Sequence, residues 1–310
     1  MVRSSVISVK KLTKLYGSAI AISDISFEVK SGEILAILGP NGAGKTSTIE
    51  ILEGYRKRTS GKVSVLGTDP EKGDRVWKSR LGVVLQSTSL DSRLKVGEAL
   101  ELYARLYPNP RNIESVLELL DLTDVVLEPI GNLSGGQQRR VDLALGIIGD
   151  PELLFLDEPT TGFDPAARRS SWQIIKNLCA EGLTVVLTTH YMEEARVLAD
   201  KLIIVADGKI IANDAPTEIG KSLKHITTIS FSLNREFITK LPKYMFRQST
   251  INGKHVSIMT RSPVSTLEKL IIWSKQNHTE LSDILVSRPT LEDIYLQLVH
   301  KSRNGDDWDE

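Results

Sequence analysis

Short apolar runs alternate with helical stretches over the first two thirds of the chain. At 5–9 and 25–29 apolar and polar positions alternate, as they do in half-buried strands. Five further runs are continuously apolar, which is typical of strands buried on both faces, and they lie at 34–38, 81–85, 153–156, 184–187 and 202–205. Strands that alternate with helices predict an α/β domain with a partly parallel sheet.

The apolar pattern changes twice along the chain. Strand signals fade between 86 and 149, where apolar residues such as Ala99, Leu100 and Tyr103 recur at helical spacing, so we expect a helical subdomain at about 87–149. A turn at 214–216 then leads into a segment with strands at 226–233 and 256–260 and helices at 266–278 and 291–300. We expect a first domain over 1–218, a small α+β domain over 219–303 and an acidic tail over 304–310.

Composition restricts the function classes. The 310 residues include 39 Lys plus Arg and 39 Asp plus Glu, so the formal net charge is zero and no nucleic-acid partner is expected. No apolar run approaches the roughly 18–20 residues that would span a bilayer. The start of the chain lacks an apolar signal-peptide core, which favours a cytosolic location.

The main chemical feature is the glycine-rich segment Gly39-Pro-Asn-Gly-Ala-Gly44-Lys45-Thr46, which lies between a predicted buried strand and a predicted helix. Glycines let backbone N–H groups surround a phosphate, and the positive end of a helix dipole adds to the attraction. Lys45 would reach the β and γ phosphates, and the Thr46 hydroxyl would bind magnesium. A chance glycine-rich turn is the alternative, which the flanking elements disfavour.

Two acidic residues, Asp157 and Glu158, follow the apolar run at 153–156. They would lie at the carboxyl edge of the sheet, where ligands bind in open α/β folds. Asp157 would hold magnesium, directly or through water, and Glu158 would polarise the attacking water. Taken alone, the pair could be a solvated acidic turn at the end of a strand.

A second glycine-rich segment, Leu133-Ser-Gly-Gly-Gln137, precedes a helical stretch. Ser134 can cap that helix while Gly135 and Gly136 leave backbone N–H groups open to an anion. An ordinary capped helix start is the alternative. One chain would then carry two half-sites for phosphate, an arrangement that makes sense if two copies face each other.

Together with 156–160, these segments resemble the ATP-binding-cassette ATPases, in particular the separate ATP-binding subunits of exporters. The resemblance covers roughly 4–218. It implies a P-loop ATPase core with a mixed sheet and a helical subdomain. It also implies that two cassettes enclose two ATP molecules, each between one chain's Walker A loop and the partner's signature loop at 134–137.

The resemblance implies roles for further residues. Tyr16 would stack on adenine, Gln86 would touch magnesium and water and couple to the membrane partner, Asp164 would lie at the dimer seam, and His190 would contact the γ phosphate. Each also has a plainer interpretation: a core or surface tyrosine, a polar strand end, a helix N-cap and a strand-end histidine.

The resemblance thus gives three sets of site residues. Catalytic roles fall to Glu158, His190 and Gln86; magnesium contacts to Thr46, Gln86 and Asp157; ATP contacts to Tyr16, Gly39, Pro40, Asn41, Gly42, Ala43, Gly44, Lys45, Thr46, Ser47, Ser134, Gly135, Gly136, Gln137 and Asp164. Two positions depart from the family's commoner residues, Phe163 for Leu and Lys95 for Thr. Neither position takes part in hydrolysis.

Segments at 143–146, 159–165 and 189–195, with the C-terminal extension, are similar to multidrug and daunorubicin-resistance exporter ATPases. This similarity implies a magnesium-dependent ATPase that drives export of drugs, antibiotics or lipid-like compounds. The partners would be a separate permease and a second ATP-binding subunit, with a homodimer expected, and the location the cytoplasmic face of the cell membrane. A soluble cassette ATPase acting on DNA or ribosomes and a non-catalytic nucleotide-gated binder are the alternatives.

Overall fold

The computed structural model describes residues 4–85, 90–219, 227–242, 245, 249–287 and 291–295 of the chain. These residues fall into two compact units that divide between Pro216 and Thr217. Each unit has its own layers and its own core, and each is described by itself below.

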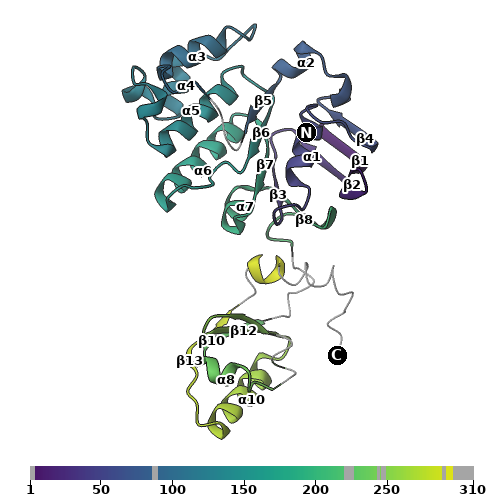
Figure 1. Cartoon of the computed structure of the whole chain (residues 1–310), viewed down its shortest axis with the longest axis vertical. Coiled ribbons are helices and arrows are strands. Elements are labelled where there is room, and N and C mark those ends of the chain that lie inside the picture. The colour runs from purple at the N-terminus through teal and green to yellow at the C-terminus, as the bar shows by residue number, and fades with distance from the viewer. Residues whose placement is uncertain are drawn as a thin grey trace. The chain divides into compact units, whose positions relative to one another are not determined.

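The first unit is built around a mixed sheet that six strands form in the described part of the chain (Figure 1). Their spatial order is β5 (Leu81–Val84), β6 (Leu153–Asp157), β7 (Thr184–Thr189), β3 (Ile34–Leu38), β8 (Lys201–Ala206) and β9 (Lys209–Asp214). The first five pair in parallel and β9 pairs antiparallel with β8. The mixed α/β class predicted from the sequence is confirmed, and every residue of β3 is buried, as its unbroken apolar run predicts.

A second, antiparallel sheet lies on the side of α1 (Lys45–Leu52) that faces away from the mixed sheet, as Figure 1 shows. Among the described residues it contains β2 (Ala19–Lys30), β1 (Ser5–Tyr16) and β4 (Ser60–Val65). One apolar core joins the two sheets through α1, and it includes Leu12, Ile51 and Phe155. The strands predicted at 5–9 and 25–29 are longer than expected, because β1 and β2 pair with each other over almost their whole length.

Helices form most of the remaining regular structure of the first unit. They are α2 (Arg75–Ser79), α3 (Val96–Ala104), α4 (Ile113–Leu119), α5 (Gly135–Ile147), α6 (Pro165–Ala180) and α7 (Met192–Leu198), with 3₁₀ turns at Pro70–Lys72, Thr123–Val125 and Ile130–Asn132. In the described stretch 90–149 the helices α3, α4 and α5 follow one another without an intervening strand. This stretch carries the second glycine-rich segment at the start of α5.

The second unit has the order of a split β-α-β fold. Its described elements are β10 (Thr227–Ser232), α8 (Arg235–Ile238), β11 (Ser249–Asn252), β12 (His255–Thr260), α10 (Pro263–Gln276) and β13 (Ser282–Ser287). The strands pair antiparallel in the order β11-β12-β10-β13, over a core that contains Phe231, Leu270 and Trp273. The predicted helix at 266–278 begins earlier, with Pro263 in its first turn, a position that suits the fixed φ of proline. Of the predicted helix at 291–300, residues 291–295 are helical and the rest lie outside the described residues.

Within the described ranges no helix is both long enough and apolar enough to cross a bilayer.

Candidate functional site

The first glycine-rich segment forms the loop between β3 and α1. Gly44 caps α1 with a φ of 100°, and a Cβ there would lie 2.4 Å from the carbonyl oxygen of Ala21, so only glycine fits. The α1 N-terminus therefore begins directly at Lys45, with the loop wrapped in front of it. This is the geometry in which backbone N–H groups and a helix dipole bind phosphate. The loop and first helical turn hold the predicted residues Gly39, Pro40, Asn41, Gly42, Ala43, Gly44, Lys45, Thr46 and Ser47.

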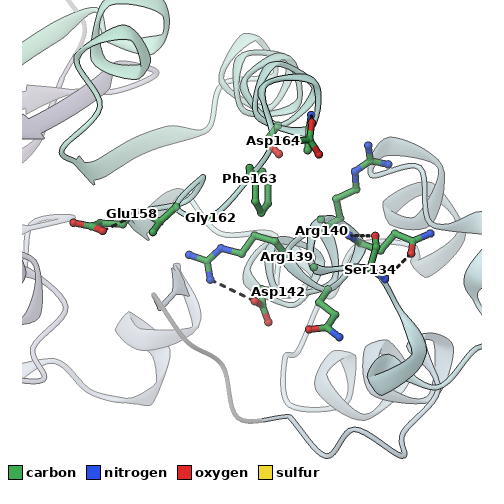
Figure 2. Close-up of a pocket in the computed structure, with 15 residues that line it drawn as sticks. Ser134, Arg139, Arg140, Asp142, Glu158, Gly162, Phe163 and Asp164 are labelled. Carbon is green, nitrogen blue, oxygen red and sulfur yellow. Dashed lines mark hydrogen bonds and ion pairs between the residues drawn. The ribbon is translucent and has the colours of Figure 1, made fainter.

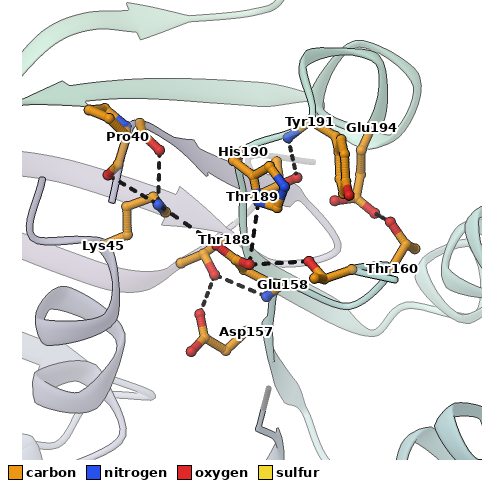
Figure 3. Close-up of polar contacts among 12 residues, drawn as sticks. Pro40, Lys45, Asp157, Glu158, Thr160, Thr188, Thr189, His190, Tyr191 and Glu194 are labelled. Atoms are coloured by element: carbon orange, nitrogen blue, oxygen red, sulfur yellow. Dashed lines mark hydrogen bonds and ion pairs between the residues drawn. The ribbon is translucent and has the colours of Figure 1, made fainter. Parts of the chain in front are cut away.

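Lys45 turns back into this loop and is only 6% exposed. Its Nζ donates hydrogen bonds to the carbonyl oxygens of Gly39 at 2.8 Å and Pro40 at 3.3 Å, and it lies 3.9 Å from Glu158 Oε1 (Figure 3). Burial lowers the pKa of Lys45, while the charges of Glu158 and Asp157 oppose that shift. The ammonium group is thus held beside two carboxylates, ready to exchange carbonyl contacts for phosphate contacts.

Asp157 and Glu158 stand at the carboxyl end of β6, as predicted. Glu158 has a φ of 48°, a left-handed conformation that costs energy for a residue with a side chain. Its N–H donates to Thr188 at the end of β7, to the carbonyl oxygen at 3.2 Å and to Oγ1 at 3.1 Å, while the Thr188 hydroxyl donates to Asp157 Oδ1. The neighbouring strand therefore holds both acidic residues in position.

The side chain of Glu158 points toward a second group that can carry positive charge. His190 Nδ1 lies 3.3 Å from Glu158 Oε2, and the Thr161 hydroxyl donates to the same oxygen at 3.1 Å (Figure 3). His190 is 39% exposed, whereas Glu158 is 13% exposed. A half-buried carboxylate between Lys45 and His190 is well placed to orient a water molecule near a phosphate.

The magnesium residues predicted from the sequence offer oxygen donors, which suit this cation. Thr46 is exposed in the first turn of α1, and Asp157 is half-buried at the end of β6. Gln86, the third predicted ligand and also a predicted catalytic residue, lies outside the described residues. The hydroxyl and the carboxylate fit Mg²⁺ by donor type.

The second glycine-rich segment begins α5 and lines a hollow of about 1000 Å³ (Figure 2). Ser134 is the N-cap: its hydroxyl accepts from the Gln137 N–H at 3.3 Å, and the Gln137 side chain accepts from the Ser134 N–H at 3.0 Å. A Cβ added at Gly135 would meet nothing within 4 Å, and one at Gly136 would lie 3.8 Å from Ala167 Cβ. The N-terminus of α5 is thus open toward the hollow.

Glu158 and Asp164 also line this hollow, so one surface carries the carboxylate predicted to be catalytic and the glycine-rich N-terminus of α5. Asp164 caps α6, where its Oδ1 accepts from the N–H groups of Ala166 at 2.8 Å and Ala167 at 2.9 Å. These backbone hydrogen bonds lower the pKa of Asp164. The helix-capping interpretation of Asp164 is therefore observed, and its role at a dimer seam stays a prediction.

Tyr16 ends β1 and lies beside α1. Its hydroxyl is 3.0 Å from Ser47 Oγ, and its ring is 41% exposed. Lys14 Nζ and the Arg56 guanidinium carbon lie 4.9 Å and 5.3 Å from the ring centroid. The structure brings this exposed aromatic ring next to the phosphate-binding loop.

Sequence reasoning missed the residues that support the site. Thr188 holds Asp157 and Glu158, and the signal for it was a polar residue at the end of an apolar strand. Glu194 Oε1 accepts hydrogen bonds from Thr160 Oγ1 at 2.7 Å and from Trp172 Nε1 at 3.0 Å, which ties the loop after β6 to α7. Arg139, in α5, also contacts these segments, and no local sequence pattern indicates it.

Comparison with known proteins identifies one matching family and relatives that are similar to nearly the whole chain. Residues 22–161 match the family described as ABC transporter. The chain is 34% identical over 293 residues to the Nod factor export ATP-binding protein I of Rhizobium johnstonii, covering 93% of this chain and 92% of that protein. It is 33% identical over 308 residues to the daunorubicin resistance ATP-binding protein DrrA2 of Streptomyces coeruleorubidus, covering 94% of this chain and 95% of that protein.

Solved structures agree with the sequence relatives. The cassette MJ0796, in a dimeric post-hydrolysis state bound to ADP and Pi, aligns with a TM-score of 0.61 at 27% identity, over 67% of this chain and 98% of that one. The resemblance to exporter ATPases predicted from the sequence is confirmed. The chain therefore belongs to the ABC transporter family, in which it is an ATP-binding subunit with ATPase activity.

Proposed function

We propose that the chain drives export of drugs, antibiotics or lipid-like compounds through a separate membrane permease, as a homodimer that closes around two ATP molecules with Mg²⁺. The observation that carries this proposal is the convergence of Lys45, Asp157, Glu158 and His190 beside the loop at the α1 N-terminus. The names of the two relatives, one for Nod factor export and one for daunorubicin resistance, support an exporter.

Each site residue has a chemical task in this proposal. Lys45 and the N–H groups of the loop neutralise the β and γ phosphates, and Thr46, Asp157 and Gln86 hold Mg²⁺, which stabilises charge on the phosphates. Glu158 orients the attacking water, and His190 contacts the γ phosphate. Tyr16 stacks on adenine through its exposed ring. The protein supplies positions and charge, since phosphoryl transfer needs little covalent chemistry.

A second copy completes the site. The open α5 N-terminus at Ser134, Gly135 and Gly136 would bind the γ phosphate of ATP held by the partner, with Gln137 nearby and Asp164 at the seam. Two identical chains related by a two-fold axis would form two such sites. ATP then favours the closed dimer through contacts that the open form lacks, and hydrolysis removes them.

The permease would dock at a groove of about 890 Å³ in the first unit. Leu85, the residue before Gln86, lines this groove and is 50% exposed, and Tyr55 at another wall is 80% exposed. Exposed apolar groups such as Leu85, which precedes Gln86 in the sequence, would let closure of the ATP site act on the permease. In this proposal the chain lies at the cytoplasmic face of the membrane, with the cassette in 1–218 and an accessory domain in 219–303.

Glu53 in this groove makes the fold sensitive to pH. Burial, with the charges of Asp157 and Glu50, raises its pKa from 4.5 to about 7. The folded chain therefore binds more protons than the unfolded chain between these values, so this contribution to stability is lost as pH rises through 7. The free energy of unfolding of Glu53→Gln, measured with urea, should exceed that of wild type by more at pH 8 than at pH 5. Glu118→Gln, at an exposed helix position, is the control and should show no such change with pH. The same difference between Glu53→Gln and wild type at both pH values would contradict the prediction.

Membrane recovery tests the proposed function. Expressed in its native host, the chain should pellet with membranes and co-purify with one integral membrane protein. Deleting that protein should move most of the chain to the supernatant. Purely cytosolic recovery under mild lysis would instead favour a soluble cassette ATPase and would contradict the permease proposal.

A further inference from the structure

Arg139 connects three segments of the first unit that lie far apart in the sequence. It is in the second turn of α5, five residues after Ser134, and its side chain is 13% exposed. The guanidinium donates from Nη2 to the carbonyl oxygen of Asp157 at 3.1 Å, from Nε to that of Pro159 at 3.2 Å, and from Nη1 to that of Leu85. A planar group with five N–H donors can make these bonds at once, which a lysine ammonium cannot match in geometry.

Two of these carbonyl groups belong to the residues on either side of Glu158. Glu158 has the left-handed φ of 48°, and such a conformation persists only where the surroundings hold it. Thr188 holds its N–H group, as described above, and Arg139 holds the peptide before it and the residue after it. The direction of the Glu158 side chain therefore depends on a residue of α5.

The third carbonyl group, that of Leu85, belongs to the residue that precedes Gln86. Asp142, one turn further along α5, lies 3.4 Å from Arg139 Nη1 and keeps the guanidinium charge paired on the same helix (Figure 2). Asp142 lines both the hollow at Ser134 and the groove at Leu85. Arg139 and Asp142 thus stand in the wall between the two surfaces.

We propose that Arg139 is a positioning residue that couples the N-terminus of α5 to Glu158 of the same chain, and through the dimer couples the two ATP sites to each other. This rests on the proposed function, in which Ser134 and Gly136 of one chain bind ATP held by its partner. A shift of α5 when that ATP binds would move the Arg139 guanidinium, and with it the peptides around Glu158. ATP at one site would thereby set the geometry of hydrolysis at the other.

Steady-state hydrolysis by the purified full chain tests this coupling. Wild type should hydrolyse Mg-ATP with a Hill coefficient above 1. Arg139→Gln should lower kcat about 10- to 100-fold, the size of effect that a misplacement of about 1 Å produces. Its Hill coefficient should fall to about 1, because the second site no longer responds to the first. Affinity for ATP, measured by calorimetry, should change less than threefold, since the Lys45 loop keeps its own contacts.

Two further substitutions separate positioning from simple stabilisation. Arg139→Lys should recover part of kcat and of the Hill coefficient, because an ammonium group can still reach one or two of the carbonyl groups. Arg80→Gln is the matched control: Arg80 pairs with Glu152, and the pair joins the N-terminal ends of β5 and β6, at the far ends of these strands from Glu158. It should lower the melting temperature without changing kcat or the Hill coefficient.

The outcomes are distinguishable. A cooperative wild type with an equally fast and cooperative Arg139→Gln variant would overturn the coupling and leave the proposed function standing. A wild type that hydrolyses ATP without cooperativity would overturn the two-site arrangement and the coupling with it. If Arg139→Gln does not fold, Asp142→Asn decides, and it should lower the Hill coefficient with unchanged ATP affinity; an unchanged Hill coefficient would overturn the proposal.

Discussion

Glu158→Gln should give a chain that binds ATP, hardly hydrolyses it and elutes as a dimer. The amide keeps the shape of the side chain but no longer attracts a proton from water, so kcat should fall by about 10²–10⁴, the usual contribution of a general base. The closed form then accumulates, because ATP holds it together and turnover no longer opens it. Size-exclusion chromatography with Mg-ATP and a phosphate-release assay measure the two effects.

The contacts of Glu158 explain why binding should survive. Its carboxylate faces Lys45 at 3.9 Å and His190 at 3.3 Å. Phosphate oxygens can replace the carboxylate as partners of both groups once ATP is bound. Glu152→Gln, at a 56% exposed position outside the site, is the control and should remain active and monomeric after turnover. Brisk hydrolysis by Glu158→Gln would remove Glu158 from the proposed role.

The sequence predicts the buried strands of the fold well, because a strand buried on both faces is a continuous run of apolar residues. β3 coincides with the apolar run at 34–38, and β7 extends the predicted run at 184–187 by two threonines that are themselves buried. The second half of β1 has no such apolar run: its lysines Lys10, Lys11 and Lys14 are typical of a loop, and pairing with both β2 and β4 makes this half a strand. β4 was missed for the same reason, since it begins with Ser60-Gly61-Lys62.

The residues of the candidate site also fall into two groups, one that the sequence predicts and one that it does not. Residues that we propose contact a phosphate, such as Lys45, lie in short glycine-rich or acidic motifs whose spacing is visible in the chain. Residues that hold those motifs in place act across long sequence distances: Thr188 on Asp157 over 31 residues, and Arg139 on Leu85 over 54. Such contacts form only when the chain folds and brings these segments together, so no local sequence pattern predicts them.

Lys45→Ala should abolish nucleotide binding under ordinary assay conditions. Lys45 is buried at the mouth of the loop, and its two carbonyl contacts, with Gly39 and Pro40, give way readily to a phosphate of higher charge. Removing one partner of a desolvated charge pair costs about 2–5 kcal/mol, which raises Kd by about 30- to several thousand-fold. Isothermal titration calorimetry with Mg-ATP measures this change.

The neighbouring carboxylates make the loss of ATP affinity larger than it would be for a lysine without acidic neighbours. Without Lys45, Glu158 and Asp157 keep their negative charge in the space where the γ phosphate must enter, so they would repel it. Lys57→Ala provides the control, since Lys57 is exposed on the surface and should leave Kd unchanged. A chain with both Lys45→Ala and Glu158→Gln should bind ATP more tightly than Lys45→Ala alone, because the amide removes part of the repulsion between the carboxylates and the γ phosphate. Unchanged ATP affinity in Lys45→Ala would contradict the assignment of the glycine-rich loop as the phosphate site.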